Sequence, residues 1–293
     1  MRRIVLLCAD THGGHKLSLM NPTVKLPDKT TGKIRDDNGN PITYTPATTA
    51  MQRWLWECWS EDIRSVRDLA GNDEIIVVHA GDITWGMKHP DDLVSGRMSD
   101  QPHIATANLL PLAILDNVRT IRLIHGTEAH EVDHGSSNEI VANYLKGQFP
   151  EKSIRAVRHS LLDIDGVTID AAHHGPVTGS RSWLKGNVLR YSIRSQMMGD
   201  LLQGREPARV YVRAHYHEYT KELVRVDAAP PRESFGMILP AYCGLTHYAQ
   251  KVTRSAYMIG CGMVALEIVD GKLSWEGVHA YHRTVDLRTK EAM

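Results

Sequence analysis

The stretch Ile4-Val5-Leu6-Leu7-Cys8-Ala9-Asp10-Thr11-His12 decides the fold, because its apolar run ends abruptly at an acidic residue and a histidine. A short apolar run of this kind is typical of a buried strand. Similar runs end just before further Asp or His residues: Ile75–Val78 precedes Gly81-Asp82, Val167–Ala172 precedes His173 and Val210–Ala214 precedes His215. The pattern predicts several strands whose ends carry polar side chains to one edge of a sheet.

Helical segments alternate with these strands in the first two-thirds of the chain. Amphipathic patterns predict helices over about 48–69, 101–117, 138–145 and 182–202. Such alternation favours a layered α/β core. The last third, about 219–283, is strand-rich and is expected to complete a second sheet. No linker divides the 293 residues, so we predict a single domain with a polar loop or hairpin insertion at about 13–47, whose tip lies at Asp37-Asn38-Gly39-Asn40.

Bulk composition narrows the class of protein. The 34 basic and 34 acidic residues cancel, which argues against strong non-specific binding to nucleic acid. The four cysteines form no C-x-x-C pair and are expected to be reduced, as in a cytoplasmic protein. No apolar run approaches the roughly 20 residues of a membrane span, so no membrane partner is expected.

Five polar pieces carry the candidate chemistry. Asp and neutral His supply the oxygen and nitrogen lone pairs that transition-metal ions bind. Six or seven such ligands suffice for two ions, which together clamp the attacking and leaving oxygens of a phosphoryl displacement. The pieces are Asp10-Thr11-His12, Gly81-Asp82, Gly126-Thr127-Glu128-Ala129-His130, His173-His174-Gly175 and His215-Tyr216-His217.

Each piece alone has a simpler interpretation. Asp10 with His12 is explained by a capping aspartate beside a surface histidine, Gly81-Asp82 by a turn, and His215 with His217 by strand decoration. The five together, each at the end of an expected strand, indicate a metal site. Glu128 remains open between a ligand and a surface carboxylate.

The order of these pieces resembles the calcineurin-like metallophosphoesterase superfamily, whose series is D-x-H, G-D-x-x-D, G-N-H-D/E, H and G-H-x-H. The resemblance covers about residues 4–217. More narrowly, Asp10–Gly14 and Gly126–His130 look like a branch found in phages and prophages. The resemblance implies a four-layer αββα sandwich and a cytoplasmic protein, of a bacterial host if the chain is phage-derived.

Site roles follow only from this resemblance. It implies that Asp82 lies between two divalent transition-metal ions, that a bridging hydroxide is the nucleophile, and that His130 contacts the phosphate and protonates the leaving group. Manganese is expected, while Fe, Zn, Co and Ni stay open. The ligands implied are Asp10, His12 and His217 on one ion, and His215 with His173 or His174 on the other.

The chain departs from the family pattern at three places. Asp82 is followed by Ile83-Thr84-Trp85, so the second carboxylate is missing. Thr127 stands where the family has its Asn ligand, and either Thr127 or Glu128 replaces that ligand; Thr127 is also a candidate for binding substrate. Ala214 replaces a glycine. Between the paired histidines, His173 is favoured because it directly ends the apolar run.

The expected function is a dinuclear metal-dependent phosphoesterase. A phosphodiesterase acting on nucleic acid or nucleotides is preferred, because the narrower resemblance is to phage proteins. A phosphomonoesterase or nucleotidase is the alternative enzyme. A non-catalytic scaffold on the same fold is the alternative of a different class, and the altered Gly126–His130 segment is the feature that supports it.

Overall fold

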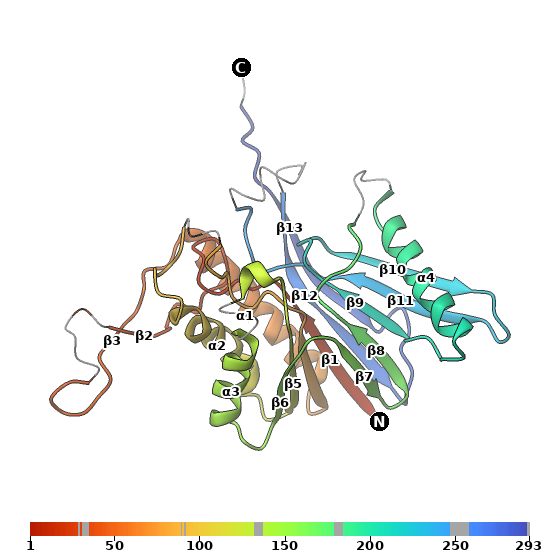
Figure 1. The fold of residues 1–293 in the computed structure, drawn as a ribbon, viewed down its shortest axis with the longest axis horizontal. Helices are drawn as coiled ribbons and strands as arrows, with labels where there is room; N and C mark the ends of the chain where they lie inside the picture. Colours follow the sequence, from red (N-terminus) through yellow and green to blue (C-terminus); the bar gives the residue numbers. More distant parts are fainter. Residues whose placement is uncertain are drawn as a thin grey trace.

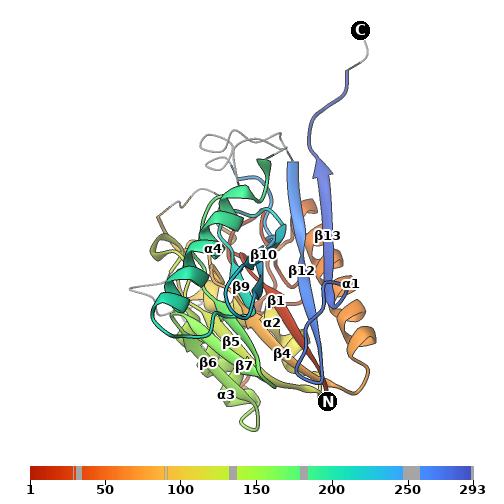
Figure 2. The ribbon, with the colours of Figure 1, turned by 90° about the vertical axis from the view of Figure 1, so that its right-hand side faces the viewer.

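Two β-sheets packed face to face form the centre of the protein, in a computed structural model that describes residues 1–28, 30, 35–88, 90, 92–131, 137–178, 184–246 and 258–291. Figure 1 shows helices α2 and α3 on one side of the sheets and α4 on the other. The view in Figure 2 places α1 and α4 on opposite sides, with the strands between them.

The first sheet has six strands in the order β13-β12-β1-β4-β5-β6. The four strands β1, β4, β5 and β6 are parallel, β12 pairs antiparallel with β1, and β13 pairs antiparallel with β12. Their bounds are β1 Arg2–Cys8, β4 Glu74–His79, β5 Val118–Ile124, β6 Ser153–Val157, β12 Met258–Val269 and β13 Val278–Asp286.

The second sheet has five strands in the order β10-β11-β9-β8-β7. These are β7 Ser160–Ile164, β8 Val167–Ala171, β9 Val210–Arg213, β10 Thr220–Val226 and β11 Arg232–Ile238. The expected β7–β8 hairpin is present, and both turn residues, Asp165 and Gly166, have the positive φ angles of a tight turn (52° and 90°).

Three hydrophobic cores separate four layers. One core fills the space between the sheets and includes Val5, Val78 and Val212. A second lies between the first sheet and its helices, and a third lies under α4. The helices are α1 Ala50–Ala70, α2 Asp100–Ala113, α3 Ser137–Gln148 and α4 Asn187–Leu202. The αββα sandwich expected from the sequence is therefore confirmed.

Helix α1 illustrates how local sequence sets an element. Thr49 and Gln52 form a reciprocal capping box that satisfies free N–H groups at the start of the helix. Leu55 and Trp59 lie on the buried face and are fully enclosed, as the 3.6-residue periodicity predicted. The Trp59 indole N–H donates to the carbonyl oxygen of Asn108, which joins α1 to α2.

Three expectations about elements were wrong in detail. The C-terminal strands do not all enter the second sheet, because β12 returns beside β1 and carries β13 with it. Strand β6 was not expected, since Ser153–Val157 alternates exposed and buried residues at a sheet edge instead of forming an apolar run. Helix α2 ends at Ala113, four residues early, because residues 114–117 turn directly into β5.

The polar segment at 13–47 contains a small separate ladder, β2 Leu26–Pro27 with β3 Thr43–Tyr44, seen at the left of Figure 1. Its tip turns at residues 36–40, where the Asp36 N–H donates to the Asn40 carbonyl. Residues 29 and 31–34 of this segment, and the first two residues of the helix expected at 182–202, lie outside the described residues. Within the part of the chain that the structure describes, no helix has the length and apolarity needed to cross a membrane.

Candidate metal centre

The carboxyl ends of five strands meet at one edge of the sandwich. Loops after β1, β4 and β5 of the first sheet and after β8 and β9 of the second all end there. The loop after β1 continues the sheet, since Asp10 and His12 donate backbone N–H groups to the carbonyls of Gly81 and Asp82. The polar pieces identified in the sequence are thus gathered from both sheets, as ligand sites in α/β folds commonly are.

Backbone conformations in the strained left-handed region orient these side chains. Asp10, His12, Asp82, His215 and His217 all have φ between 44° and 77°, in the left-handed region that non-glycine residues rarely adopt. Each such residue costs about 1–3 kcal/mol of local strain. This strain lets the Asp and His side chains of the D-x-H and H-x-H pieces, which are two residues apart, enter the region where the five loops meet.

Asp10, His12 and His217 form the first cluster. Nε2 of His12 and Nε2 of His217 are 3.1 Å apart, and Oδ1 of Asp10 lies 3.3 Å from the His217 nitrogen and 3.7 Å from the His12 nitrogen. Asp10 and His12 are almost fully buried. The other carboxylate oxygen of Asp10 accepts the backbone N–H of His215, at 3.2 Å, and so ties the two sheets together.

Asp82, Thr127, His173 and His215 form the second cluster. The Thr127 hydroxyl lies 3.1 Å from Nδ1 of His215 and 3.2 Å from Nε2 of His173. Oδ2 of Asp82 lies 3.0 Å from Nε2 of His173 and 3.3 Å from the Thr127 hydroxyl. Oδ1 of Asp82 accepts the Thr127 backbone N–H at 2.5 Å, which fixes the turn that presents the hydroxyl.

Asp82 lies between the two clusters. Its carboxylate lies within 4.8 Å of ligand atoms of His12 and His130, and also of Asp10 and His173, so it neighbours members of both clusters. Gly126 makes this position possible, because a Cβ there would lie 2.0 Å from Oδ1 of Asp82. The carboxylate therefore stands where a bridging ligand would have to be.

The pKa values of the titratable side chains at the site are shifted in different directions. Burial disfavours the charged form of His173, but the charge of Asp82 and the hydrogen bond with it outweigh burial and raise the His173 pKa to about 9. Burial lowers the pKa of His12 well below its usual value, and the neighbouring His130 adds to this effect. Burial also opposes ionisation of Asp10, yet the adjacent His217 holds the Asp10 pKa at about 2.

These donors fit divalent ions. Ligand atoms about 2.1 Å from one ion lie about 3.0 Å apart in octahedral and about 3.4 Å apart in tetrahedral coordination. Most of the separations within each cluster fall near these values. Oδ1 of Asp10 is buried and makes no hydrogen bond of good geometry, although the His217 and His12 Nε2 atoms lie 3.3 and 3.7 Å away, and a cation would satisfy it better. The mixed imidazole and carboxylate set suits transition ions such as Mn, Fe or Zn.

His130 faces both clusters from the short helix η1, Glu128–His130. Its Nδ1–H donates to the Trp85 carbonyl at 2.7 Å, which leaves Nε2 directed inward, 3.9 Å from Oδ2 of Asp82. The ring centroid of His130 lies 4.6 Å from that of His12 and 4.9 Å from that of Trp85. The imidazole is thus held in one orientation, with one nitrogen free for a ligand.

The two remaining predicted residues lie at the margin. His174 is exposed, and its ring nitrogen groups with those of His173 and His215. His173 is buried and donates or accepts at both ring nitrogens within the site, so the structure places it deeper than His174. Glu128 is exposed and belongs to none of the clusters of ligand atoms found among the described residues.

Sequence reasoning missed three supporting residues. Trp85 orients His130 through its backbone carbonyl, which no sequence pattern signals. The Cys243 thiol lies within ligand range of His12 and His217 but is protonated, since burial raises its pKa. Glu131 accepts from the Gly126 and Ser137 N–H groups and the Asn138 amide, and so ties the Gly126–His130 turn to the start of α3. The position of Glu131 directly after His130 is the sequence feature that could have identified it.

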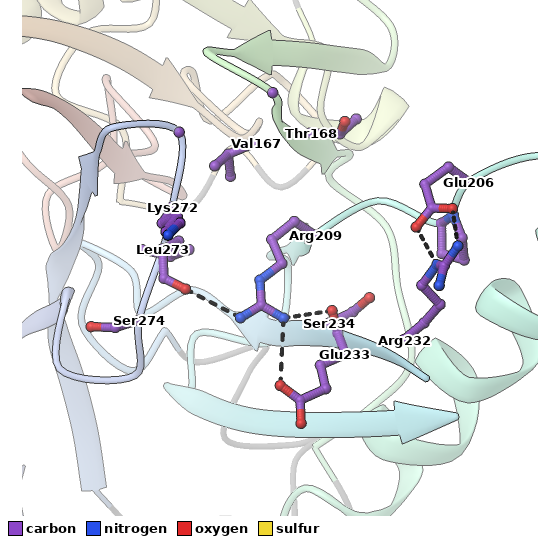
Figure 3. Close-up of a pocket in the computed structure, with 13 residues that line it drawn as sticks. Val167, Thr168, Glu206, Arg209, Arg232, Glu233, Ser234, Lys272, Leu273 and Ser274 are labelled. Carbon is purple, nitrogen blue, oxygen red and sulfur yellow. Dashed lines mark hydrogen bonds and ion pairs between the residues drawn. The ribbon is translucent and has the colours of Figure 1, made fainter. Parts of the chain in front are cut away.

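A cavity of about 490 Å³ lies at the opposite edge of the sandwich, where β8, β9 and β11 begin. Figure 3 shows Arg209 at its centre. The Arg209 guanidinium donates to the backbone carbonyls of Glu233 and Leu273, and Arg232 pairs with Glu206. Both arginines are therefore already engaged, and the cavity is separate from the histidine clusters.

Comparisons with known proteins add little. No family model and no curated protein matches the sequence. Among solved structures, the chain is similar to a metallophosphoesterase from Sphaerobacter thermophilus, with 12% sequence identity and a TM-score of 0.32, covering 96% of this chain and 88% of that one. A likeness this distant says nothing about activity, so any function must follow from the side chains at the site.

Proposed function

We propose that the protein is a dinuclear metal-dependent phosphoesterase that prefers phosphodiesters, with nucleic acid or nucleotides as the substrate class. One observation carries the proposal: two clusters of ligand atoms, from both sheets, share the carboxylate of Asp82. A pair of divalent ions at such positions acidifies water and neutralises the oxygens of a phosphate ester. The preference for diesters rests on the motif resemblance alone.

The chain's own residues would divide the remaining tasks. Asp82 positions the two clusters relative to each other, since it contacts members of both. His130 presents Nε2 toward the same space and can hold a proton at that atom for a departing oxygen, because its Nδ1–H is committed to the Trp85 carbonyl. Proton transfer from a side chain held in this way contributes typically 10²–10⁴-fold to rate.

The test compares hydrolysis of bis-p-nitrophenyl phosphate with that of p-nitrophenyl phosphate. Metal-free protein receives Mn²⁺, and the Asp82→Asn variant, which keeps the shape but removes the charge, serves as the matched control. Faster diester hydrolysis that the variant lacks supports the proposal and leads to single-stranded and duplex DNA as the next substrates.

Other outcomes would redirect the assignment. Faster hydrolysis of the monoester would identify a phosphomonoesterase or nucleotidase. No turnover of either ester, with no ion retained, would favour a non-catalytic scaffold. The buried Asp10 carboxylate oxygen makes no hydrogen bond of good geometry, which argues against an ion-free scaffold because a poorly satisfied buried carboxylate is costly to keep.

A further inference from the structure

Helix α4 carries an apolar stripe on the side that faces away from the protein. Its buried side consists of Leu189, Ile193 and Met197, which pack on the second sheet. The opposite side exposes residues at alternating spacings of three and four, so that they are neighbours along one line of the helix. We call this line the α4 stripe; its members are Val188, Tyr191, Ser195, Met198 and Leu202.

The helix on the other side of the sandwich exposes residues of a different kind. Helix α1 lies opposite α4, as Figure 2 shows, and every exposed residue of α1 after its first is charged. These residues are Arg53, Glu57, Glu61, Arg64, Arg67 and Asp68. A polar outer face is usual for a helix at the surface, whereas a contiguous apolar patch marks an interaction surface.

The spacing of the α4 stripe matches a partner that is itself a helix. Apolar residues three and four apart occupy the a and d positions of a heptad, where side chains pack between those of a second helix. Ser195 lies in the middle of the stripe and Gly199 lies beside it, and such small residues allow two helix axes to approach within about 8 Å. The stripe therefore has both the pattern and the shape that helix packing requires.

The exposed area of the stripe is sufficient for a dimer. Tyr191 is 71% exposed and Leu202 is 82% exposed, while Val188 and Met198 are each 40% exposed. For side chains of this size, these fractions amount to about 450 Å² of apolar surface on each copy. A standard interface buries about 800 Å² per partner, of which roughly 60% is apolar. The α4 stripe alone supplies nearly all of that apolar share.

An antiparallel arrangement makes the stripe complementary to itself. Positions a and d face each other between antiparallel helices, which places Tyr191 against Leu202 of the second copy. The same register places Ser195 against Met198 of the second copy, so that the small residue leaves room for the large one. A two-fold axis relates the two halves of this contact, as in the commonest class of homo-oligomer.

Charge favours the same arrangement. Arg194 is exposed at the margin of the stripe and forms no ion pair within the described part of the chain. In the antiparallel register it lies beside the last turn of the second helix, where the helix dipole is negative. A parallel register would bring the two Arg194 side chains together.

We propose that the protein forms a two-fold symmetric dimer in which α4 packs antiparallel on α4 of a second copy. No residue of the two histidine clusters lies on α4, so this contact does not depend on the proposed function.

The experiment measures the mass of the protein by sedimentation velocity, over concentrations from about 1 to 100 µM, because interfaces of this size have affinities of micromolar or better. We expect a species of twice the 32.8 kDa mass of one chain. Tyr191→Glu and Leu202→Lys each place a charge in the interface, and each should weaken association at least about 10-fold. Both side chains are exposed in the single chain, so thermal unfolding of the dilute variants should match that of the unaltered monomer.

A matched control places the same charge on another exposed apolar residue. Leu161 is 68% exposed on β7, at the opposite edge of the second sheet from β10. Leu161→Lys should therefore remain a dimer.

Mixing the two interface variants tests the register. A heterodimer of Tyr191→Glu with Leu202→Lys contains one Glu–Lys contact and one unaltered Tyr–Leu contact, so the mixture should dimerise although neither variant does alone. A parallel pair gains no such contact, and a mixture that stays monomeric would overturn the antiparallel arrangement.

Other results would overturn the dimer itself. A single species of monomer mass throughout the concentration range would do so, as would a dimer that neither Tyr191→Glu nor Leu202→Lys weakens. Monomeric protein that binds vesicles of phosphatidylcholine and phosphatidylserine, and loses this binding in Tyr191→Glu, would assign the α4 stripe to a membrane surface instead.

Discussion

Oδ2 of Asp82 and Nε2 of His173 lie 3.0 Å apart, although one follows β4 of the first sheet and the other follows β8 of the second. Both side chains are 1% exposed. The pair joins the two sheets at the edge where the ligand atoms gather, and it keeps a proton on His173 in the metal-free protein.

Ion binding should therefore release a proton near neutral pH. With a pKa of about 9, His173 is protonated at pH 7.5 in the metal-free protein, and a metal ligand must be neutral. Calorimetric titration with Mn²⁺ in buffers of different ionisation enthalpy should report about one proton released on ion binding at pH 7.5, falling to about half a proton at pH 9. A number of released protons that does not change with pH would contradict the protonated state of His173.

The same pair predicts how the stability of the metal-free protein depends on pH. A histidine whose folded-state pKa is raised stabilises the protein fully below its unfolded pKa of about 6.5. That stabilisation is lost as pH rises from about 6.5 through about 9. Urea unfolding between pH 6 and 9 should show this decline, and His173→Gln should flatten it.

Gly126→Ala should disrupt the second cluster while the protein stays folded. The added Cβ would lie 2.0 Å from Oδ1 of Asp82 and 2.2 Å from its backbone nitrogen, so the Asp82 loop must move. We expect a loss of at least about 10-fold in affinity for the second Mn²⁺. Gly147→Ala in α3, where a Cβ meets nothing within 4 Å, should leave metal binding unchanged and stabilise the fold by about 0.5–1 kcal/mol.

His130→Asn should slow hydrolysis most for esters with poor leaving groups. The variant cannot supply a proton from Nε2, and only a basic departing oxygen requires one. We expect kcat to fall about 10²-fold or more for an alkyl phosphodiester and much less for bis-p-nitrophenyl phosphate, with metal stoichiometry unchanged. An equal loss for both esters would assign His130 to binding instead of proton transfer.

Asp62→Ala should destabilise the fold without changing the site. The Asp62 carboxylate is 1% exposed and accepts from the Tyr242 hydroxyl and from Arg283, each at 2.6 Å, so it joins α1 to β13. Its removal leaves a buried hydroxyl unpaired, and we expect a loss of about 2–4 kcal/mol in the free energy of unfolding. Glu61→Ala removes the exposed partner of the same arginine and should cost under about 1 kcal/mol.

Sequence alone predicted a layered α/β core and the residues of the candidate site. Short apolar runs such as Ile4–Ala9, too short for a typical helix, favour buried strands, and the 3.6-residue pattern of α1 predicts its buried face. Asp10, Asp82 and His215 follow such runs, and parallel strands end at a common edge. Local pattern therefore predicted a layered α/β core and the residues that would gather at its edge, while the four-layer sandwich was implied by the family resemblance.

Only the tertiary structure decided what each of those residues contacts. The left-handed backbone at His12 and His217, the position of Thr127 among three ligand atoms and the exposure of Glu128 depend on loops from both sheets packing together. The return of β12 to the first sheet is likewise a long-range pairing. Periodicity indicates which face of an element is buried. Which residue a side chain contacts, when the two are far apart in the sequence, depends on tertiary packing that no local pattern encodes.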